Sequence, residues 1–73
     1  MAHAIELLDV VALTEDLPEA ELQRGEVGTV VEDLPPDAYL VEFSDYSGEA
    51  YAIVPVEASQ LMVLKHERAP KSR

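Results

Sequence analysis

The chain of 73 residues has no cysteine and no tryptophan, and its aromatic residues are three tyrosines and one phenylalanine. Without cysteine it forms neither a disulfide framework nor a thiolate metal site, and we expect no cofactor. Apolar runs such as Val10–Leu13 and Leu61–Leu64 have only four residues, far short of the roughly 20 that a membrane-spanning helix needs. The first six residues contain no lysine or arginine, which is untypical of a signal peptide. We therefore expect a soluble, cytoplasmic protein with no membrane contact.

Basic residues are also scarce in most of the chain. Residues 1–64 hold fourteen acids and a single base, Arg24, giving a charge of −13, whereas residues 65–73 hold four bases and one acid, giving +3. A body of such negative charge repels a phosphate backbone, so we expect no nucleic-acid binding. A net charge far from zero favours solubility, and it also makes the chain complementary to a basic partner. Both interpretations fit the composition.

Short apolar runs separated by turn residues predict β-strands rather than helices. The third run alternates with period two, so Tyr39, Val41 and Phe43 share one face, which we predict to be buried. Five strands are expected, at residues 7–13, 27–32, 39–43, 49–54 and 61–64.

The connections between these strands differ in length. A long polar loop covers residues 14–26, and within it Pro18–Gly25 has a proline where a helix would begin and a glycine where it would end. A loop and a short helical turn both fit this segment, and Leu22 is the side chain that could anchor either. Asp45–Gly48 predicts a hairpin turn in which Gly48 adopts a positive φ, and residues 55–60 predict a single turn.

Five strands, a long first loop and a turn before the last strand predict an all-β fold, a small five-stranded SH3-like barrel. A small sheet resolves the problem of its exposed edges by curling into a barrel or sandwich. An OB-fold is the competitor, but it usually has longer strands and a helix between the third and the fourth. We place the barrel at residues 5–64 and a disordered basic tail at residues 65–73.

Residues that could perform catalysis are few and scattered. His3 and His66 lie near the two termini, and no serine has a histidine partner within a predicted strand. The pair Gly25 and Gly28 lacks the lysine and the following helix of a phosphate-binding loop, so we interpret Gly25 as a turn residue and Gly28 as the site of either a bulge or a close backbone approach. The acidic loops lack the calcium-binding pattern of the EF-hand. We expect no enzyme and no metal site.

Four segments follow one another along the chain: LLDVVAL at residues 7–13, LQRGEVGTVVE at 22–32, YLVEF at 39–43, and the return strand at 48–54. In these segments the chain resembles the bacterial family Domain of Unknown Function 4926, and the resemblance extends from Leu7 to Leu64. It implies an SH3-like fold without catalytic residues. It also implies a genetic setting suggestive of toxin–antitoxin pairs, and fold analogy alone does not transmit function.

The sequence as a whole predicts a non-enzymatic protein-interaction module that recognises a partner with a basic surface, in its narrowest form the antitoxin or immunity-like partner of a small bacterial toxin. A structural accessory domain or a homo-oligomer is the alternative, because unpaired strand edges promote association. A groove for proline-rich peptides is not expected, since Tyr39 and Phe43 are assigned to the core. The predicted partner-binding residues lie in the long loop and around the hairpin turn: Glu15, Asp16, Glu19, Glu21, Asp45, Tyr46, Glu49 and Tyr51.

Overall fold

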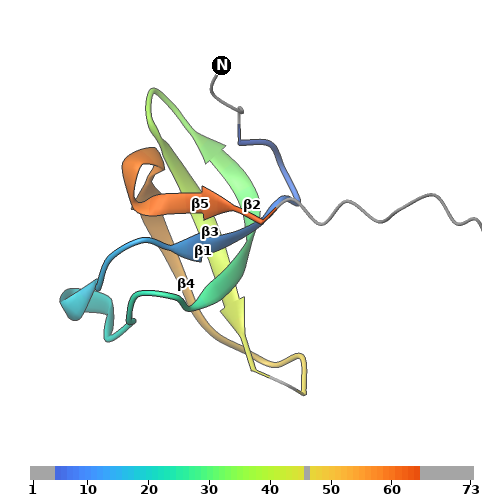
Figure 1. Ribbon diagram of the computed structural model, residues 1–73. Helices are drawn as coiled ribbons and strands as arrows, with labels where there is room; N and C mark the ends of the chain where they lie inside the picture. Colours follow the sequence, from blue (N-terminus) through green and yellow to red (C-terminus); the bar gives the residue numbers. More distant parts are fainter. Residues whose placement is uncertain (1–4, 46, 65–73) are drawn as a thin grey trace, which may run out of the picture.

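The computed structural model describes residues 5–45 and 47–64. The described chain forms five strands and two single 3₁₀ turns (Figure 1): β1 (Val10–Leu13), η1 (Pro18–Ala20), β2 (Val27–Leu34), β3 (Ala38–Ser44), β4 (Ala50–Glu57), η2 (Ala58–Gln60) and β5 (Leu61–Val63). All strand pairs are antiparallel and belong to one sheet in the order β4–β3–β2–β1–β5, so β4 and β5 are its edges. The all-β prediction with five strands is confirmed. The basic segment 65–73 and both histidines lie outside the described residues.

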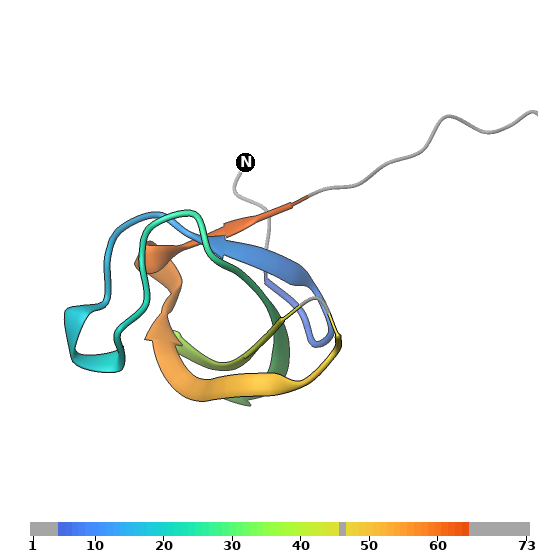
Figure 2. The ribbon, with the colours of Figure 1, turned by 90° about the horizontal axis from the view of Figure 1, so that it is seen from below.

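The sheet curls around a single apolar core, as Figure 2 shows. Val41 and Phe43 are completely buried. Tyr39 is half-buried and packs against the core cluster. The predicted inward face of β3 is therefore confirmed. No polar or charged side chain is buried in the described part of the chain. The core cluster consists of Val11, Leu13, Leu22, Val30, Val41, Phe43, Val56 and Leu61.

Gly28 lies in β2, where side chains and backbone of β3 approach it closely. It lies opposite Val11 on β1 and Phe43 on β3. A Cβ atom added at Gly28 would lie 2.7 Å from Val41 Cγ1, 2.8 Å from the Glu42 carbonyl oxygen and 2.9 Å from Phe43 Cδ1. These separations are too short for any side chain. Of the two alternatives predicted for Gly28, the structure shows the close backbone approach, and the register shift of the β2–β3 pair lies between Val30 and Glu32 instead.

The first strand is shorter than predicted, because it begins at Val10 rather than at Leu7. Leu7 and Leu8 lie in a turn, and Leu8 has a φ of 70°. This turn is closed by two bonds between its ends: Glu6 N–H donates to Asp9 Oδ2 at 2.9 Å, and Asp9 N–H donates to the Glu6 carbonyl oxygen at 3.1 Å. The local bonds of an Asp side chain here outweigh the strand preference of two leucines.

The fourth strand is longer than predicted, because it continues through Pro55 to Glu57 and leaves only Ala58–Gln60 for the turn. Proline is tolerated since β4 is an edge strand. The N–H of Ala58 donates to the Asp37 carbonyl oxygen at 2.8 Å. Antiparallel ladders alternate between bonded and non-bonded pairs, so Ala52, Val54 and Val56 of β4 direct their N–H groups toward β3. The nitrogen of Pro55 consequently lies on the open edge, where no ladder bond is lost.

Candidate interaction site

The long loop between β1 and β2 is a narrow two-stranded ribbon. Its base is closed by two backbone bonds, from Gly25 N–H to the Leu13 carbonyl at 2.8 Å and from Leu13 N–H to the Glu26 carbonyl at 3.0 Å. Near its tip, Leu17 and Leu22 exchange backbone bonds of 2.8 and 3.1 Å in an isolated β-bridge. Of the segment Pro18–Gly25, for which both a loop and a short helical turn were open, only the three residues of η1 are helical.

This loop is fixed to the body of the protein by one apolar side chain and stiffened by two carboxylates. Leu22 is only 3% exposed and belongs to the core cluster, which confirms it as the anchor. Asp16 Oδ1 accepts a hydrogen bond from Arg24 N–H at 2.8 Å, and Glu26 Oε2 accepts one from Gln23 N–H at 2.9 Å. The acidic loop therefore has a defined conformation, and its buried and hydrogen-bonded side chains have defined positions relative to the sheet.

A groove of about 630 Å³ lies between this loop and the second half of β4. We call it the loop–β4 groove. In Figure 2 the loop and η1, in cyan, stand beside β4, in orange. Apolar lining comes from both walls, from the loop and from β4, and acidic side chains lie on both walls. The lining residues are Glu15, Asp16, Leu17, Pro18, Glu19, Ala20, Ala38, Val54, Pro55, Val56, Glu57 and Gln60.

Gln60 joins the two walls of the loop–β4 groove. Its Nε2 donates to Glu15 Oε2 at 2.8 Å, across to the loop, while its Oε1 accepts from Glu57 N–H at 3.1 Å on its own wall. Its carbonyl oxygen also accepts from Thr14 N–H at 2.9 Å. The bonds with Glu15 and Thr14 tie η2 to the start of the loop, and the bond from Glu57 N–H holds the Gln60 side chain on its own wall.

The electrostatic character of the groove is entirely negative. Four carboxylates line it, and no lysine, arginine or histidine does. Arg24, the one base among residues 5–64, is not part of the lining and contacts Asp16 through its backbone nitrogen. A cleft lined by charges of one sign concentrates the field and attracts counter-charge. Among the residues described, no three potential metal ligands are grouped to hold a metal ion.

The β3–β4 turn contains a second set of acidic side chains. Asp45 Oδ1 accepts three hydrogen bonds, from Ser47 N–H at 3.0 Å, from Ser47 Oγ at 2.7 Å and from Glu49 N–H at 3.0 Å. The bond from the Ser47 hydroxyl is the main reason why the pKa of Asp45 is lowered. Gly48 has a φ of 87°, as predicted for the turn. Asp45 therefore stabilises the turn through its carboxylate.

Tyr51 lies at the start of β4 and is half exposed. Its hydroxyl donates a hydrogen bond to Glu26 Oε1 at 2.7 Å. This bond, together with partial desolvation and the nearby negative charges, raises the pKa of Tyr51. The pair links the return strand of the hairpin to the base of the first loop.

The predicted loop residues fall on two sides of the loop. Glu15, Asp16 and Glu19 line the loop–β4 groove. Glu21 instead lines a separate recess that it shares with Gln23 and part of the loop tip. Three of the four predicted loop acids are thus brought together in one site.

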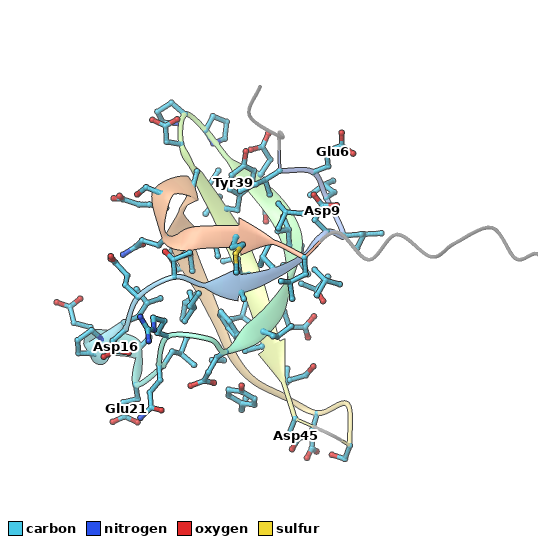
Figure 3. The ribbon with its side chains drawn as sticks, in the orientation of Figure 1. Glu6, Asp9, Asp16, Glu21, Tyr39 and Asp45 are labelled. Carbon is cyan, nitrogen blue, oxygen red and sulfur yellow. The ribbon has the colours of Figure 1, made fainter. Side chains whose placement is uncertain are left out.

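The predicted hairpin residues are not part of this site. In Figure 3, Asp16 and Glu21 lie on the first loop and Asp45 lies at the tip of the β3–β4 hairpin, a different part of the molecule. Tyr46 is outside the described residues. The residues that lie around the hairpin, away from the lining of the groove, are Asp45, Glu49 and Tyr51.

The sequence profile of the family described as Domain of unknown function (DUF4926) matches residues 7–63. The chain belongs to this family. The matched span contains all five strands and every residue that lines the loop–β4 groove. No curated protein and no solved structure matches the chain. Within the described residues of this DUF4926 protein, the helical segments are too short to cross a membrane.

Sequence reasoning missed the second wall of the groove in this DUF4926 protein. The sequence predicts that Glu57 and Gln60 belong to a turn that begins at Pro55. A usable signal was present, because the alternation of Ala52, Val54 and Val56 continues the inward face of β4 past the proline. A proline at a non-bonded edge position does not end a strand.

Proposed function

We propose that this chain is a non-enzymatic protein-interaction module that binds a basic segment of a partner protein in the loop–β4 groove. The observation that carries this proposal is the composition of the groove, which combines apolar side chains on both walls with four carboxylates and no base. Apolar walls would bury the aliphatic parts of a ligand, and the carboxylates would accept its positive groups. Charge complementarity of this kind raises the association rate and selects among partners.

We infer that the curled sheet is an SH3-like barrel. The strand order β4–β3–β2–β1–β5, the long β1–β2 loop and the 3₁₀ turn before β5 support this assignment. SH3 domains that bind proline-rich peptides stack them on aromatic side chains. The lining of the loop–β4 groove contains no aromatic residue, so the recognition we propose depends on charge and aliphatic contact instead.

A titration followed by NMR tests the proposal. The probe is a blocked nine-residue peptide with three arginines separated by alanines, and its counterpart carries glutamates in place of the arginines. We expect the arginine peptide to shift the amide signals of the residues lining the groove, and to bind more weakly as salt is added because exposed charges are screened. The glutamate peptide should not bind. Equal shifts at the groove and at the β3–β4 hairpin would show nonspecific attraction and contradict the proposal.

Variants that each remove one negative charge distinguish the effect of the groove carboxylates on peptide binding from the effect of the overall negative charge. Glu19→Gln and Glu57→Gln each remove one carboxylate from the groove, and Glu49→Gln removes one from the hairpin. Each groove variant should weaken peptide binding by roughly twofold to fivefold, the value of an exposed ion pair. Glu49→Gln should leave binding within error of the wild type. Equal losses for all three would mean that net charge, not the groove, determines binding.

In the narrower form of this proposal, the partner is a small bacterial toxin and the chain is its antitoxin or immunity-like counterpart. The family resemblance suggests this setting, and the negative groove would suit a basic toxin. Co-expression with a small protein encoded beside it provides the test. Relief of toxicity that is lost in Glu19→Gln/Glu57→Gln would support this role, and an acidic or harmless neighbour would contradict it.

Self-association is a second candidate, and the outer face of the sheet favours it. Val10, Val27 and Met62 are between 44% and 51% exposed, and strand register places them on the same face with Ile53. Sedimentation at several concentrations tests this candidate. A dimer that persists at high salt would support association through this apolar face, whereas a monomer at every concentration would exclude it.

A further inference from the structure

The side chains of the loop wall offer no hydrogen-bond donor to a ligand. Pro18 has no N–H. The N–H of Leu17 donates to the Leu22 carbonyl at 2.8 Å, and the N–H of Ala20 donates to the Leu17 carbonyl at 3.0 Å. In contrast, the carboxylates of this wall are acceptors with several lone pairs each. The side chains on this side therefore offer a ligand hydrogen-bond acceptors.

The β4 wall has the same character. Val54 and Val56 direct their N–H groups toward β3, and Pro55 between them has no N–H. The N–H of Glu57 is engaged by Gln60 Oε1 at 3.1 Å, and Gln60 Nε2 is engaged by the loop. The edge of β4 along the groove is consequently left with carbonyl and carboxylate oxygens.

This pattern opposes the addition of a peptide strand to β4. A strand that joins a sheet edge both donates and accepts backbone hydrogen bonds. Pro55 and Glu57 are the successive outward positions of β4 along the groove, and neither offers a free N–H. Missing donors and charged side chains are features that protect an edge from strand pairing. A ligand in the groove is therefore recognised through the donors that it brings, and a side chain can bring them without strand pairing.

We infer that the loop–β4 groove recognises an arginine side chain on a segment that does not pair as a β-strand. This inference rests on the proposed function and specifies its ligand. The guanidinium group has five donors in a planar fork, no acceptor, and a geometry that matches carboxylates. Its donors would meet the carboxylates of Glu19 and Glu57 from opposite walls. Its aliphatic stem lies against the apolar lining, which includes Leu17 and Val54.

Lysine fits the same site less well. Its ammonium is a compact and strongly hydrated charge, so bringing it between two walls costs more hydration and gains no bidentate contact. Citrulline has the shape of arginine without the charge. Comparing the affinities of arginine, lysine and citrulline peptides therefore distinguishes bidentate recognition of a guanidinium group from attraction to any positive charge.

The test uses calorimetric titration with a blocked peptide in which one arginine is flanked by prolines, because proline residues cannot donate to a strand edge. Versions with lysine and with citrulline are its controls, and a blocked alternating Thr-Val peptide of equal length probes strand addition. We expect the arginine peptide to bind about tenfold more tightly than the citrulline peptide, with lysine between them. The Thr-Val peptide should not bind.

The outcomes distinguish failure of this inference from failure of the proposed function. If the nine-residue arginine peptide binds the groove but the proline-flanked arginine peptide binds no better than its citrulline version, the inference is wrong and the proposed function stands. Binding of the Thr-Val peptide with protection of the Ile53 amide from exchange would establish strand addition and also overturn it. If no basic peptide binds, the proposed function and the inference both fail. Glu49→Gln is the matched variant that should leave the arginine preference unchanged.

Discussion

Replacing Gly28 by alanine tests the tightest contact in the fold. The new Cβ would lie between 2.7 and 2.9 Å from two side chains and one carbonyl oxygen of β3. Val41 and Phe43 are completely buried, and the third contact is a backbone oxygen, which moves only if β3 itself shifts. Overpacking of a core usually costs about 1–3 kcal/mol, and a reduction in the freedom of the unfolded chain offsets about 0.4–1 kcal/mol of this. The difference spans about 0–2.6 kcal/mol, and because three contacts fall below 3.0 Å we expect a net loss in its upper part, about 1–2.6 kcal/mol.

Thermal and urea unfolding followed by circular dichroism measure this loss. In a domain of this size, 1 kcal/mol corresponds to a fall in Tm of about 4–8 °C. A second measurement uses Val41→Ala, which removes the Cγ1 atom nearest to the new methyl. Gly28→Ala should cost less in that background than alone, because neighbouring changes are coupled. An unchanged or raised Tm for Gly28→Ala would refute the close approach of β3 to Gly28.

Three further changes follow from the contacts of the loop and the hairpin. Leu22→Ala should cost about 2–5 kcal/mol in urea unfolding, because it leaves a cavity under the loop; a smaller loss would mean that the loop is not anchored there. The raised pKa of Tyr51 predicts a titration midpoint above the ordinary 10.0, measured as the ultraviolet difference between wild type and Tyr51→Phe. Stability from its bond to Glu26 is present below pH 10 and is lost as pH rises through the raised pKa; a midpoint at or below 10.0 would contradict it. For Asp45 the pKa is lowered from 3.8, so its contribution is present above about pH 4 and is lost as pH falls through the lowered pKa. Asp45→Asn should therefore unfold with a weaker dependence on acid than the wild type.

The strands and the hairpin turn are readable from the sequence because their signals are local. Alternation in Tyr39–Phe43 places two completely buried side chains correctly, and a glycine after two polar residues marks the turn at Gly48. Gly28 is also readable, since a glycine inside a strand implies close backbone approach. The beginning of β1 is not, because a side-chain bond from Asp9 decides it rather than the apolar character of Leu7 and Leu8.

Only the loop wall of the loop–β4 groove could be predicted from the sequence. Glu15, Asp16 and Glu19 stand out as an acidic loop, but their partners on β4 are about 40 residues away and are brought opposite by the curl of the sheet. By composition alone, Asp45 is as good a candidate for partner binding as the acids of the loop, although sheet geometry places it at another end of the molecule. The acidic residues of the chain are recognisable from sequence, and the grouping of a few of them into a site depends on long-range packing.

The most direct measurement of the central claim is a set of intermolecular nuclear Overhauser effects between the bound arginine peptide and the methyl groups of the protein. We expect contacts from the arginine methylene protons to the methyl groups of Leu17 and Val54, which line opposite walls of the loop–β4 groove. Contacts to Val10 and Ile53 on the outer face of the sheet, without any to the groove, would contradict the claim.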